Sequence, residues 1–452
     1  MVTRRPAFAR PFATLVAVAL CLAASPPAAA QPAPPEPPTL SAADRAAIID
    51  DIAAKLDATY IFAETAAAMG EHLRAQLAAG AYDELVSLPD FTRRLTEDLQ
   101  SVSNDRHLRV GWDPNPPPAE PDPEDRERRR AVFEERMRTD NYCFRKVERL
   151  NGNVGLLKLN CFAPAELGGA TAVAAMNFLA HVDALIFDLR DNGGGSPSMI
   201  QLLTSYLVAE PTHLNSFYIR ESDETRQFWT PAHVDGRKMP DVPVWVLTSS
   251  RTFSGAEEFS YNLHNLGRAT LVGETTGGGA HPVRTQWVEG YPVMINLPFG
   301  RAVNPISGTN WEGTGVEPHV AVPAEEAFDV AYAAALEAVV ERVEDPARKG
   351  PLAFLVESIK LRQAPVELPA AQLEEYVGTY GPRVIRLEDG RLFYRRGEGA
   401  ERPLIPVGED RFLLGEMDEF RIRFERDANG RVARLVGLYD DGREEPSERS
   451  DG

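Results

Sequence analysis

The chain has 452 residues, of which 43% are hydrophobic and 25% charged, a balance that excludes wholesale disorder and collagen-like structure. At about 150 residues per domain, this length predicts two or three domains. The formal net charge is −19 and no purely basic stripe follows the N-terminus, which argues against a nucleic-acid partner. Three cysteines are too few for a disulfide scaffold and lack the spacing of a metal site.

Residues 1–30 have the three parts of an export signal. Arg4, Arg5 and Arg10 precede the apolar run ATLVAVALCLAA, and three alanines at 28–30 offer an A-x-A cleavage site. The apolar run is too short to span a membrane, which takes about 20 residues, so an uncleaved anchor is the weaker alternative. We expect a periplasmic or secreted product that is not inserted in a membrane, with a net charge of −22 once the three arginines are removed.

The mature chain begins with a proline-rich tether at 31–39. Helical periodicity starting after Ser41 predicts a helical N-terminal domain at 40–112. Residues 113–140 form a proline-rich linker and a charged helix. From 141 to 345 strands, glycine-rich turns and helices alternate, which predicts a largely parallel βαβ core.

The end of the chain has a different pattern. We expect a linker at 346–364, followed by short alternating strands with DG and NG turns at 365–452. These strands predict a small antiparallel β domain. The fold class is therefore α/β, with a helical domain before the core and a β domain after it.

Cys143 and Cys161 lie in two alternating runs on either side of the sequence NGN at 151–153. If Leu150 pairs with Val154, the two cysteines face each other across a hairpin, and a disulfide is geometrically allowed. An oxidising compartment favours such a bond. Two buried thiols are the alternative, because the register of the turn is open by one residue.

The stretch VWVLTSSRTFSGAEEF leads from a buried strand into a helix that opens at Ser254. A hydroxyl there suits a nucleophile, because a helix N-terminus favours developing negative charge and the Gly255 N–H could donate to an oxyanion. The spacing of Ser254 and Glu257 fits an ordinary capping box equally well. The surrounding sequence is not the G-x-S-x-G elbow of the α/β-hydrolases.

A glycine-rich turn, RDNGGG at 190–195, follows another buried strand. Three glycines let backbone N–H groups approach a ligand, although a simple tight turn also accounts for them. The turn matches neither a P-loop nor a dinucleotide-binding fingerprint.

A nucleophilic serine needs a general base within hydrogen-bond reach. No lysine occurs between Lys238 and Lys349, which leaves histidines as candidates, and His264 lies too far along the helix of Ser254. The other three candidates are His107, His281 and His319. Because the histidines are scattered and no paired-cysteine motif exists, we expect no metal and no cofactor.

Four motifs in order, LIFDLRDNGGG, VLTSSRTFSGAEEF, LVGETTGGGAHP and GTGVEPHVAV, resemble peptidase family S41. That family includes the tail-specific proteases, the tricorn protease core and interphotoreceptor retinoid-binding protein. The resemblance covers roughly residues 140 to 325 and implies a ClpP/crotonase-like core. The helical block ending in SNDRH is similar to the N-terminal domain of the retinoid-binding branch, and the tail from LEEYVGTYG is similar to β domains of secreted bacterial hydrolases.

The resemblance implies a serine-type endopeptidase with Ser254 as nucleophile. It also implies an oxyanion hole formed by the N–H groups of Gly255 and Gly194, with Gly193 as the rival of Gly194. The lysine base of the tail-specific branch falls on Gly279 in this sequence, so a Ser-Lys dyad is absent.

The tricorn-like branch uses a histidine and a glutamate, which match His107 and Glu312 here. Arg106 stands where that branch has a serine before its histidine, so the fourth member of the relay would be Asp105 or Ser103. His281 is the rival base, because it lies on the loop where the lysine would have been.

Only about 30 residues separate Val110 from Asn141, which leaves no room for the PDZ module of the tail-specific proteases. Selection of a protein's C-terminal carboxylate is therefore not expected. The function predicted from the sequence is an exported serine peptidase that hydrolyses peptide bonds of proteins or peptides. A non-catalytic binding protein for apolar ligands and an esterase-like acyl hydrolase are the alternatives.

Overall fold

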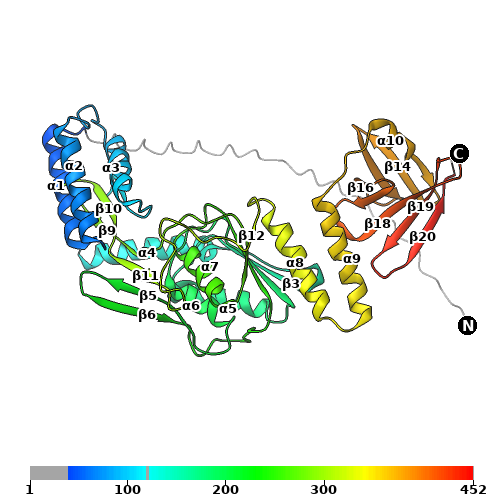
Figure 1. Cartoon of the computed structure of the whole chain (residues 1–452), viewed down its shortest axis with the longest axis horizontal. Helices are drawn as coiled ribbons and strands as arrows, with labels where there is room; N and C mark the ends of the chain where they lie inside the picture. Colours follow the sequence, from blue (N-terminus) through cyan, green and yellow to red (C-terminus); the bar gives the residue numbers. More distant parts are fainter. Residues whose placement is uncertain (1–38, 119–121, 451–452) are drawn as a thin grey trace, which may run out of the picture. The chain divides into compact units, whose positions relative to one another are not determined.

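The computed structural model describes residues 39–118 and 122–450. The predicted signal segment, 1–30, and nearly all of the predicted tether lie outside the described residues. Among the helices of the described part, none combines the length and apolarity needed to cross a membrane. The architecture is mixed α/β, with a helical N-terminal region, a central sheet and a C-terminal β domain (Figure 1).

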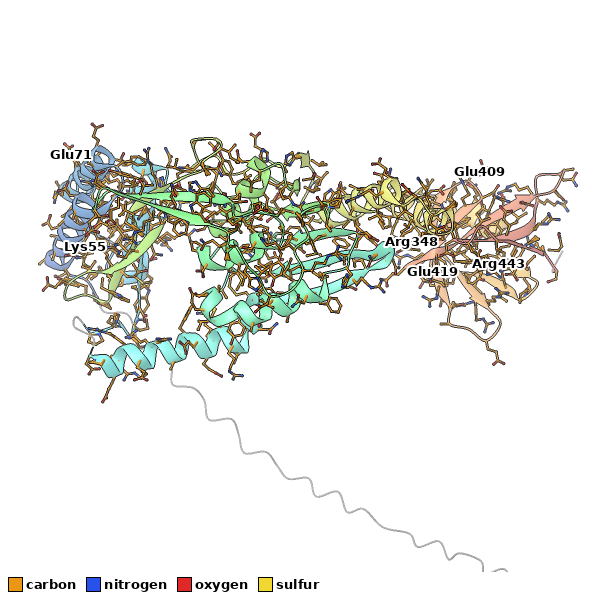
Figure 2. All side chains as sticks on the ribbon, turned by 90° about the horizontal axis from the view of Figure 1, so that it is seen from below. Lys55, Glu71, Arg348, Glu409, Glu419 and Arg443 are labelled. Atoms are coloured by element: carbon orange, nitrogen blue, oxygen red, sulfur yellow. A yellow bond between two sulfur atoms is a disulfide. The ribbon has the colours of Figure 1, made fainter. Side chains whose placement is uncertain are left out.

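Three helices form the N-terminal region, with apolar side chains at helical spacing turned toward one another. The first is opened by the reciprocal cap between Ser41 and Asp44. Exposed charged side chains such as Glu71 point outward (Figure 2). The helices are α1 (Ala42–Thr59), α2 (Ala63–Ala78) and α3 (Leu88–Ser103).

A three-stranded antiparallel sheet completes the apolar core of this helical region. Its order is β1 (Arg109–Trp112), β10 (Val293–Pro298), β9 (Val283–Trp287). Two of these strands come from the stretch predicted as the α/β core. The segment 40–112 therefore packs as one body with residues from 283–298, which holds the end of α3 against the core.

The central sheet has six strands, of which the first five are parallel and the last, β2, is an antiparallel edge. Its order is β12 (Val320–Ala321), β8 (Thr270–Gly273), β7 (Val244–Thr248), β4 (Ala184–Asp188), β3 (Val154–Leu159), β2 (Phe144–Leu150). A predominantly parallel sheet agrees with the sequence, because its strands read as continuous apolar runs that are buried on both faces.

Helices cover both faces of the central sheet. Alternating side chains of β4 show the division: Leu185 and Phe187 pack on one side, and Ile186 packs on the other. One face carries α5 (Ala165–Phe178), α6 (Pro197–Ser205) and α7 (Gly255–Asn265), and the other carries α8 (Ala327–Arg342) and α9 (Pro346–Gln363).

Helix α9 occupies the stretch that was expected to be a linker at 346–364. Gly350 and Pro351 disfavour a helix locally, and Pro351 does lie inside this one. The helix forms nevertheless because Leu355 and Ile359 are buried against α8. Tertiary burial here outweighs the local cost of a proline.

The predicted hairpin is present, and Leu150 pairs with Val154 as the register argument required. Cys143 and Cys161 are joined by a disulfide with a Cα–Cα distance of 5.3 Å. Two short turns, η1 (Asn141–Cys143) and η2 (Asn151–Asn153), lie at the ends of β2.

Two further parts flank the core. The charged helix α4 (Pro123–Thr139) has no buried residue, in agreement with a solvated helix. A second small antiparallel sheet has the order β11 (Gly300–Val303), β5 (His213–Ile219), β6 (Glu224–Trp229).

The C-terminal domain is an eight-stranded antiparallel sheet in which every strand pairs with the next one along the chain. A bridge between Tyr380 and Arg449 brings the two ends of the sheet together, so that it closes toward a barrel. Exposed Glu409 and Arg443 lie on its outside (Figure 2). After α10 (Ala370–Glu375) the strands are β13 (Gly378–Tyr380), β14 (Arg383–Glu388), β15 (Arg391–Arg396), β16 (Arg402–Gly408), β17 (Arg411–Leu414), β18 (Met417–Arg426), β19 (Val432–Tyr439) and β20 (Glu444–Glu448).

Candidate active site

Ser254 lies at the start of α7, after the loop that leaves β7, and is half-buried. Its backbone has φ 54° and ψ −121°, whereas an ordinary N-cap residue is extended. A serine with positive φ is strained, and such strain is concentrated at functional sites. The reciprocal contact of a capping box is nevertheless present, because the Ser254 N–H donates to Glu257 at 2.7 Å.

Glu257 does more than cap the helix. Its buried carboxylate also accepts hydrogen bonds from the loop after β8, from the Thr276 hydroxyl at 2.5 Å and from the N–H groups of Gly278 and Gly279 at 2.6 and 2.8 Å. Burial raises the pKa of Glu257, and these hydrogen bonds work in the opposite direction. Glu257 therefore ties Ser254 to this loop, residues 274–281, called the GGG loop below, a role that the S-G-A-E spacing alone did not reveal.

The glycine turn after β4 lies directly against Ser254. A Cβ on Gly194 would come within 2.7 Å of both the Ser254 Cβ and the Gly255 nitrogen, and Gly194 has φ +106°. Only glycine satisfies both conditions. The glycine turn, which was expected to supply an oxyanion donor, therefore lies beside Ser254.

The N–H groups of the turn are not equally free. Gly194 donates to Asn192 Oδ1 at 2.8 Å and Gly193 to the Asn160 carbonyl at 3.3 Å. Among the described residues, the N–H groups of Gly195 and Gly255 have no acceptor. The Gly195 nitrogen lies 2.9 Å from the position that a Cβ on Gly255 would take, so these two donors are neighbours. The expected donor Gly194 is already engaged, and the free N–H of the turn belongs to Gly195.

His107 reaches the core from the turn between α3 and β1. Its ring centroid is 4.6 Å from that of Phe253, the residue before the nucleophile. The ring also contacts Gly279, where a Cβ would lie 2.6 Å from His107 Cε1. Both ring nitrogens are buried and have no hydrogen-bond partner in the described part of the chain. No bond between His107 and the Ser254 hydroxyl is therefore formed in this state.

Burial lowers the pKa of His107 to about 4, and the positive charges of His281 and Arg109 add to this effect against the charge of Asp105. The ring is consequently neutral at neutral pH. A neutral, unpartnered imidazole that packs on Phe253, the residue before Ser254, can accept a proton.

The rival base, His281, lies on the GGG loop and is committed to another partner. Its Nδ1 is 2.7 Å from Asp105 Oδ2. Asp105 Oδ1 accepts a hydrogen bond from the backbone N–H of His107 at 3.0 Å. Burial alone would raise the pKa of Asp105, but the hydrogen bond and charge of His281 outweigh it and hold the pKa below its usual value. Asp105 thus connects the two histidines.

Glu312 supports the same loop. Its Oε2 accepts the N–H groups of Ala280 and His281 at 2.6 and 3.1 Å and lies 3.5 Å from His281 Nδ1. Burial, with the charge of Asp105 adding to it, raises the pKa of Glu312 to about 7. Glu312 contacts His281 and not His107, so the structure groups Glu312, His281 and Asp105 in one cluster.

The donor atoms of this cluster lie within 4.8 Å of one another, a separation that a metal ion could bridge. The separation of His281 Nδ1 and Asp105 Oδ2, 2.7 Å, is that of a hydrogen bond. Two ligands of a tetrahedral zinc ion would be roughly 3.3 Å apart. The arrangement therefore fits a proton-sharing pair better than a metal centre.

The remaining candidates of the relay have structural contacts. The Ser103 hydroxyl accepts the Asp105 N–H at 3.2 Å. Arg106, in the place of the tricorn serine, donates to the Gly277 carbonyl at 2.7 Å. Both contacts hold the segment that carries His107. The Ser103 contact joins it to the end of α3, and the Arg106 contact joins it to the GGG loop. His264 and His319 stack on each other at a centroid distance of 4.4 Å at the other end of α7.

Two family models match this chain over most of the region just described. Residues 153–322 match peptidase family S41, and residues 40–148 match the N-terminal domain of peptidase S41 in eukaryotic IRBP. The chain belongs to peptidase family S41.

Solved structures similar to this S41 chain include three that differ widely in length. The photosystem II D1 C-terminal processing protease is 22% identical over 38% of this chain and 43% of its own, with a TM-score of 0.32. A lipoprotein from Streptococcus agalactiae is 15% identical over 68% and 98%, with a TM-score of 0.44. The tricorn protease is 13% identical over 70% and 37%, with a TM-score of 0.40. This S41 chain thus spans less than half the length of the processing protease, and no residue role follows from these likenesses.

Proposed function

We propose that this protein is an exported serine peptidase of family S41 that cleaves peptide bonds of proteins or peptides through an acyl-enzyme on Ser254. The observation that carries the proposal is the position of Ser254. It combines a strained backbone at a helix N-terminus with two neighbouring N–H groups, of Gly195 and Gly255, that have no acceptor in the described chain. A capping serine requires neither feature.

In the proposed reaction the Ser254 hydroxyl attacks the peptide carbonyl and passes its proton to a ring nitrogen of His107. The oxyanion that develops accepts hydrogen bonds from the two free N–H groups. Collapse breaks the C–N bond, and His107 returns the proton to the leaving amine. Water, deprotonated by the same histidine, then hydrolyses the ester and regenerates the serine.

His107 is proposed as the base because its ring nitrogens are unengaged and it packs on Phe253. His281 is already hydrogen-bonded to Asp105, so a role as base would first require that contact to break. We assign Asp105, His281 and Glu312 to holding the segment of His107 and the GGG loop in place. Catalytic hydrogen bonds often tighten only when substrate binds, which is the step that would bring His107 and Ser254 together.

The proposal is tested by labelling the mature protein with a fluorophosphonate and locating the adduct by mass spectrometry. We expect a single adduct on Ser254 and none in Ser254→Ala. Hydrolysis of an unfolded protein such as casein by the wild type, absent in Ser254→Ala, would establish peptidase activity. Labelling without peptide hydrolysis would instead support the esterase-like alternative. No labelling would contradict the proposal.

A further inference from the structure

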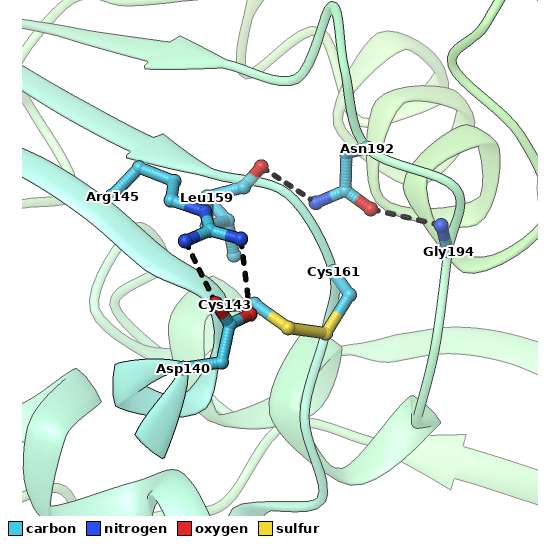
Figure 3. The surroundings of a disulfide bond; sticks show 7 residues. All are labelled: Asp140, Cys143, Arg145, Leu159, Cys161, Asn192 and Gly194. Carbon is cyan, nitrogen blue, oxygen red and sulfur yellow. Dashed lines mark hydrogen bonds and ion pairs between the residues drawn. A yellow bond between two sulfur atoms is a disulfide. The ribbon is translucent and has the colours of Figure 1, made fainter. Parts of the chain in front are cut away.

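The disulfide between Cys143 and Cys161 lies next to the glycine turn that faces Ser254 (Figure 3). It joins the beginning of β2 to the end of β3. The residues on both sides of Cys161 are the ones that contact the turn, and none of these contacts is required by the β2–β3 hairpin itself.

Backbone groups next to Cys161 hold the turn on both sides. The Asn160 carbonyl accepts the Gly193 N–H at 3.3 Å. Phe162 donates its N–H to the Gly194 carbonyl at 2.8 Å and accepts the Ser196 N–H at 2.6 Å. These three bonds fix the residues around Gly195 while they leave its own N–H free.

The Asn192 side chain adds a fourth connection (Figure 3). Its Nδ2 donates to the Leu159 carbonyl at 2.9 Å, and its Oδ1 accepts the Gly194 N–H at 2.8 Å. The Phe162 ring also packs on Phe259 of α7, with centroids 5.4 Å apart. Residues 159–162 therefore contact both elements that supply the free donors, the glycine turn and the helix that begins at Gly255.

The other end of the disulfide lies in a strained turn. Asn141, Tyr142 and Cys143 are three consecutive non-glycine residues with φ of 48°, 52° and 67°. Such residues persist in the left-handed region only where the surrounding structure constrains them. The constraints here include the disulfide, the ion pair between Asp140 and Arg145 at 2.7 Å, and the bond from the Asn160 N–H to the Cys143 carbonyl at 3.0 Å.

We infer that the Cys143–Cys161 disulfide is a positioning element for the oxyanion site: it holds residues 159–162 against the glycine turn and so keeps the Gly195 N–H beside that of Gly255. The inference rests on the peptidase function proposed above. Without the disulfide, the strained turn at 141–143 relaxes and Cys143 separates from Asn160. The glycine turn at 190–195 then loses the support of residues 159–162. Stabilisation of an oxyanion depends on donors that are fixed in advance, so the chemical step slows while substrate binding does not.

The test compares wild type with Cys143→Ser/Cys161→Ser, each as the mature chain. Asn153→Ala is the matched control, because it removes hydrogen bonds to the His181 carbonyl and Asp183 at the opposite end of the same hairpin, away from the turn. Two quantities are measured, the hydrogen–deuterium exchange of peptides covering 192–196 and the acylation rate per active site. The fraction of active sites is counted by fluorophosphonate titration.

We expect exchange at 192–196 to rise at least tenfold in the double variant, and the acylation rate per active site to fall about tenfold with KM unchanged. That is less than the ~10²–10³ caused by complete loss of an oxyanion donor. Asn153→Ala should change neither quantity. Treatment of wild type with a reductant should reproduce the double variant, and reoxidation should reverse it.

Unchanged exchange at 192–196 in the double variant would overturn the inference whether or not the protein is an enzyme. A smaller fraction of active sites with an unchanged rate per site would also overturn it, because the disulfide would then serve stability alone. Absence of labelling in the wild type would contradict the proposed function, and the exchange measurement would still decide whether the disulfide holds the turn.

Discussion

The backbone N–H of Ser254 donates to the carboxylate of Glu257 at 2.7 Å, and that carboxylate also receives three hydrogen bonds from the GGG loop. One buried side chain thus sets the spacing between Ser254 and the loop against which His107 packs. The hydrogen bond to Ser254 is local in sequence, whereas those to the loop join residues about 20 positions apart.

Glu257→Gln should disable the site without unfolding the chain. The amide has one oxygen where the carboxylate has two, and its NH₂ group would face backbone N–H groups. We expect a loss of about 2 kcal/mol in the free energy of unfolding and a fluorophosphonate labelling rate lowered at least tenfold. Chemical denaturation and labelling kinetics measure the two effects.

The neighbouring Glu258→Gln is the matched control. Glu258 is also buried, and burial, opposed by the side chains of Asn215 and Asn262, raises its pKa to about 7. Within the described chain no hydrogen bond joins its side chain to the GGG loop, so Glu258→Gln should label at the wild-type rate. Equal losses in the two variants would refute the specific role of Glu257.

His107→Ala should lower kcat by about 10²–10⁴, the usual contribution of a general base, while the protein stays folded. His281→Ala should act mainly through stability, because it removes one hydrogen bond from the buried Asp105 carboxylate, at a cost of about 2 kcal/mol. Hydrolysis rates and denaturation curves separate the two. If His107→Ala retains activity and folded His281→Ala loses it, the base is His281.

Gly194→Ala should abolish activity. Its Cβ would collide with Ser254 and the Gly255 nitrogen, and its φ of +106° disfavours any side chain. We expect a loss of about 2 kcal/mol or more in stability and a labelling rate below about 1% of wild type. Gly193→Ala is the control, because no atom lies within 4 Å of the position that its Cβ would take. Comparable damage at both positions would contradict this placement of the turn.

The free energy of unfolding should depend on pH through His107 and Glu312, which act in opposite directions. The pKa of His107, about 4, lies below its ordinary 6.5, so its contribution is present above about pH 6.5 and is lost as the pH falls toward 4. The pKa of Glu312, about 7, lies above its ordinary 4.5, so its contribution is present below about pH 4.5 and is lost as the pH rises toward 7. Each shift corresponds to about 3 kcal/mol, and the two act in opposite directions.

Replacing one of the two residues should reveal how the other changes the free energy of unfolding with pH. Between pH 4.5 and 6.5, Glu312→Gln should gain stability relative to wild type as the pH rises, because the titration of Glu312 that opposes His107 is removed. His107→Gln should lose stability over the same interval. Denaturant unfolding of the three proteins at both pH values measures this, and three parallel profiles would contradict the assigned protonation states.

The local features of the site were predictable from the sequence. Ser254 at a helix start, the glycine turn at 190–195 and the facing cysteines follow from residue type and spacing, because φ requirements, capping and strand alternation act over a few residues. The α/β core and the C-terminal β domain followed in the same way from periodicity. Local preference is overridden at α9, where Gly350 and Pro351 disfavour a helix and burial against α8 stabilises one.

Which side chains meet was decided only by the tertiary structure. Asp105 and His281 are 176 positions apart, and no periodicity indicates that they share a hydrogen bond. The free N–H of the glycine turn belongs to Gly195 and not to the expected Gly194, because the Asn192 side chain engages the N–H of Gly194. The sequence by itself determined the family, the nucleophile candidate and the elements that carry it. The protonation of His107 and the partner of His281 were determined by burial and by contacts between distant segments, which exist only once the chain has folded.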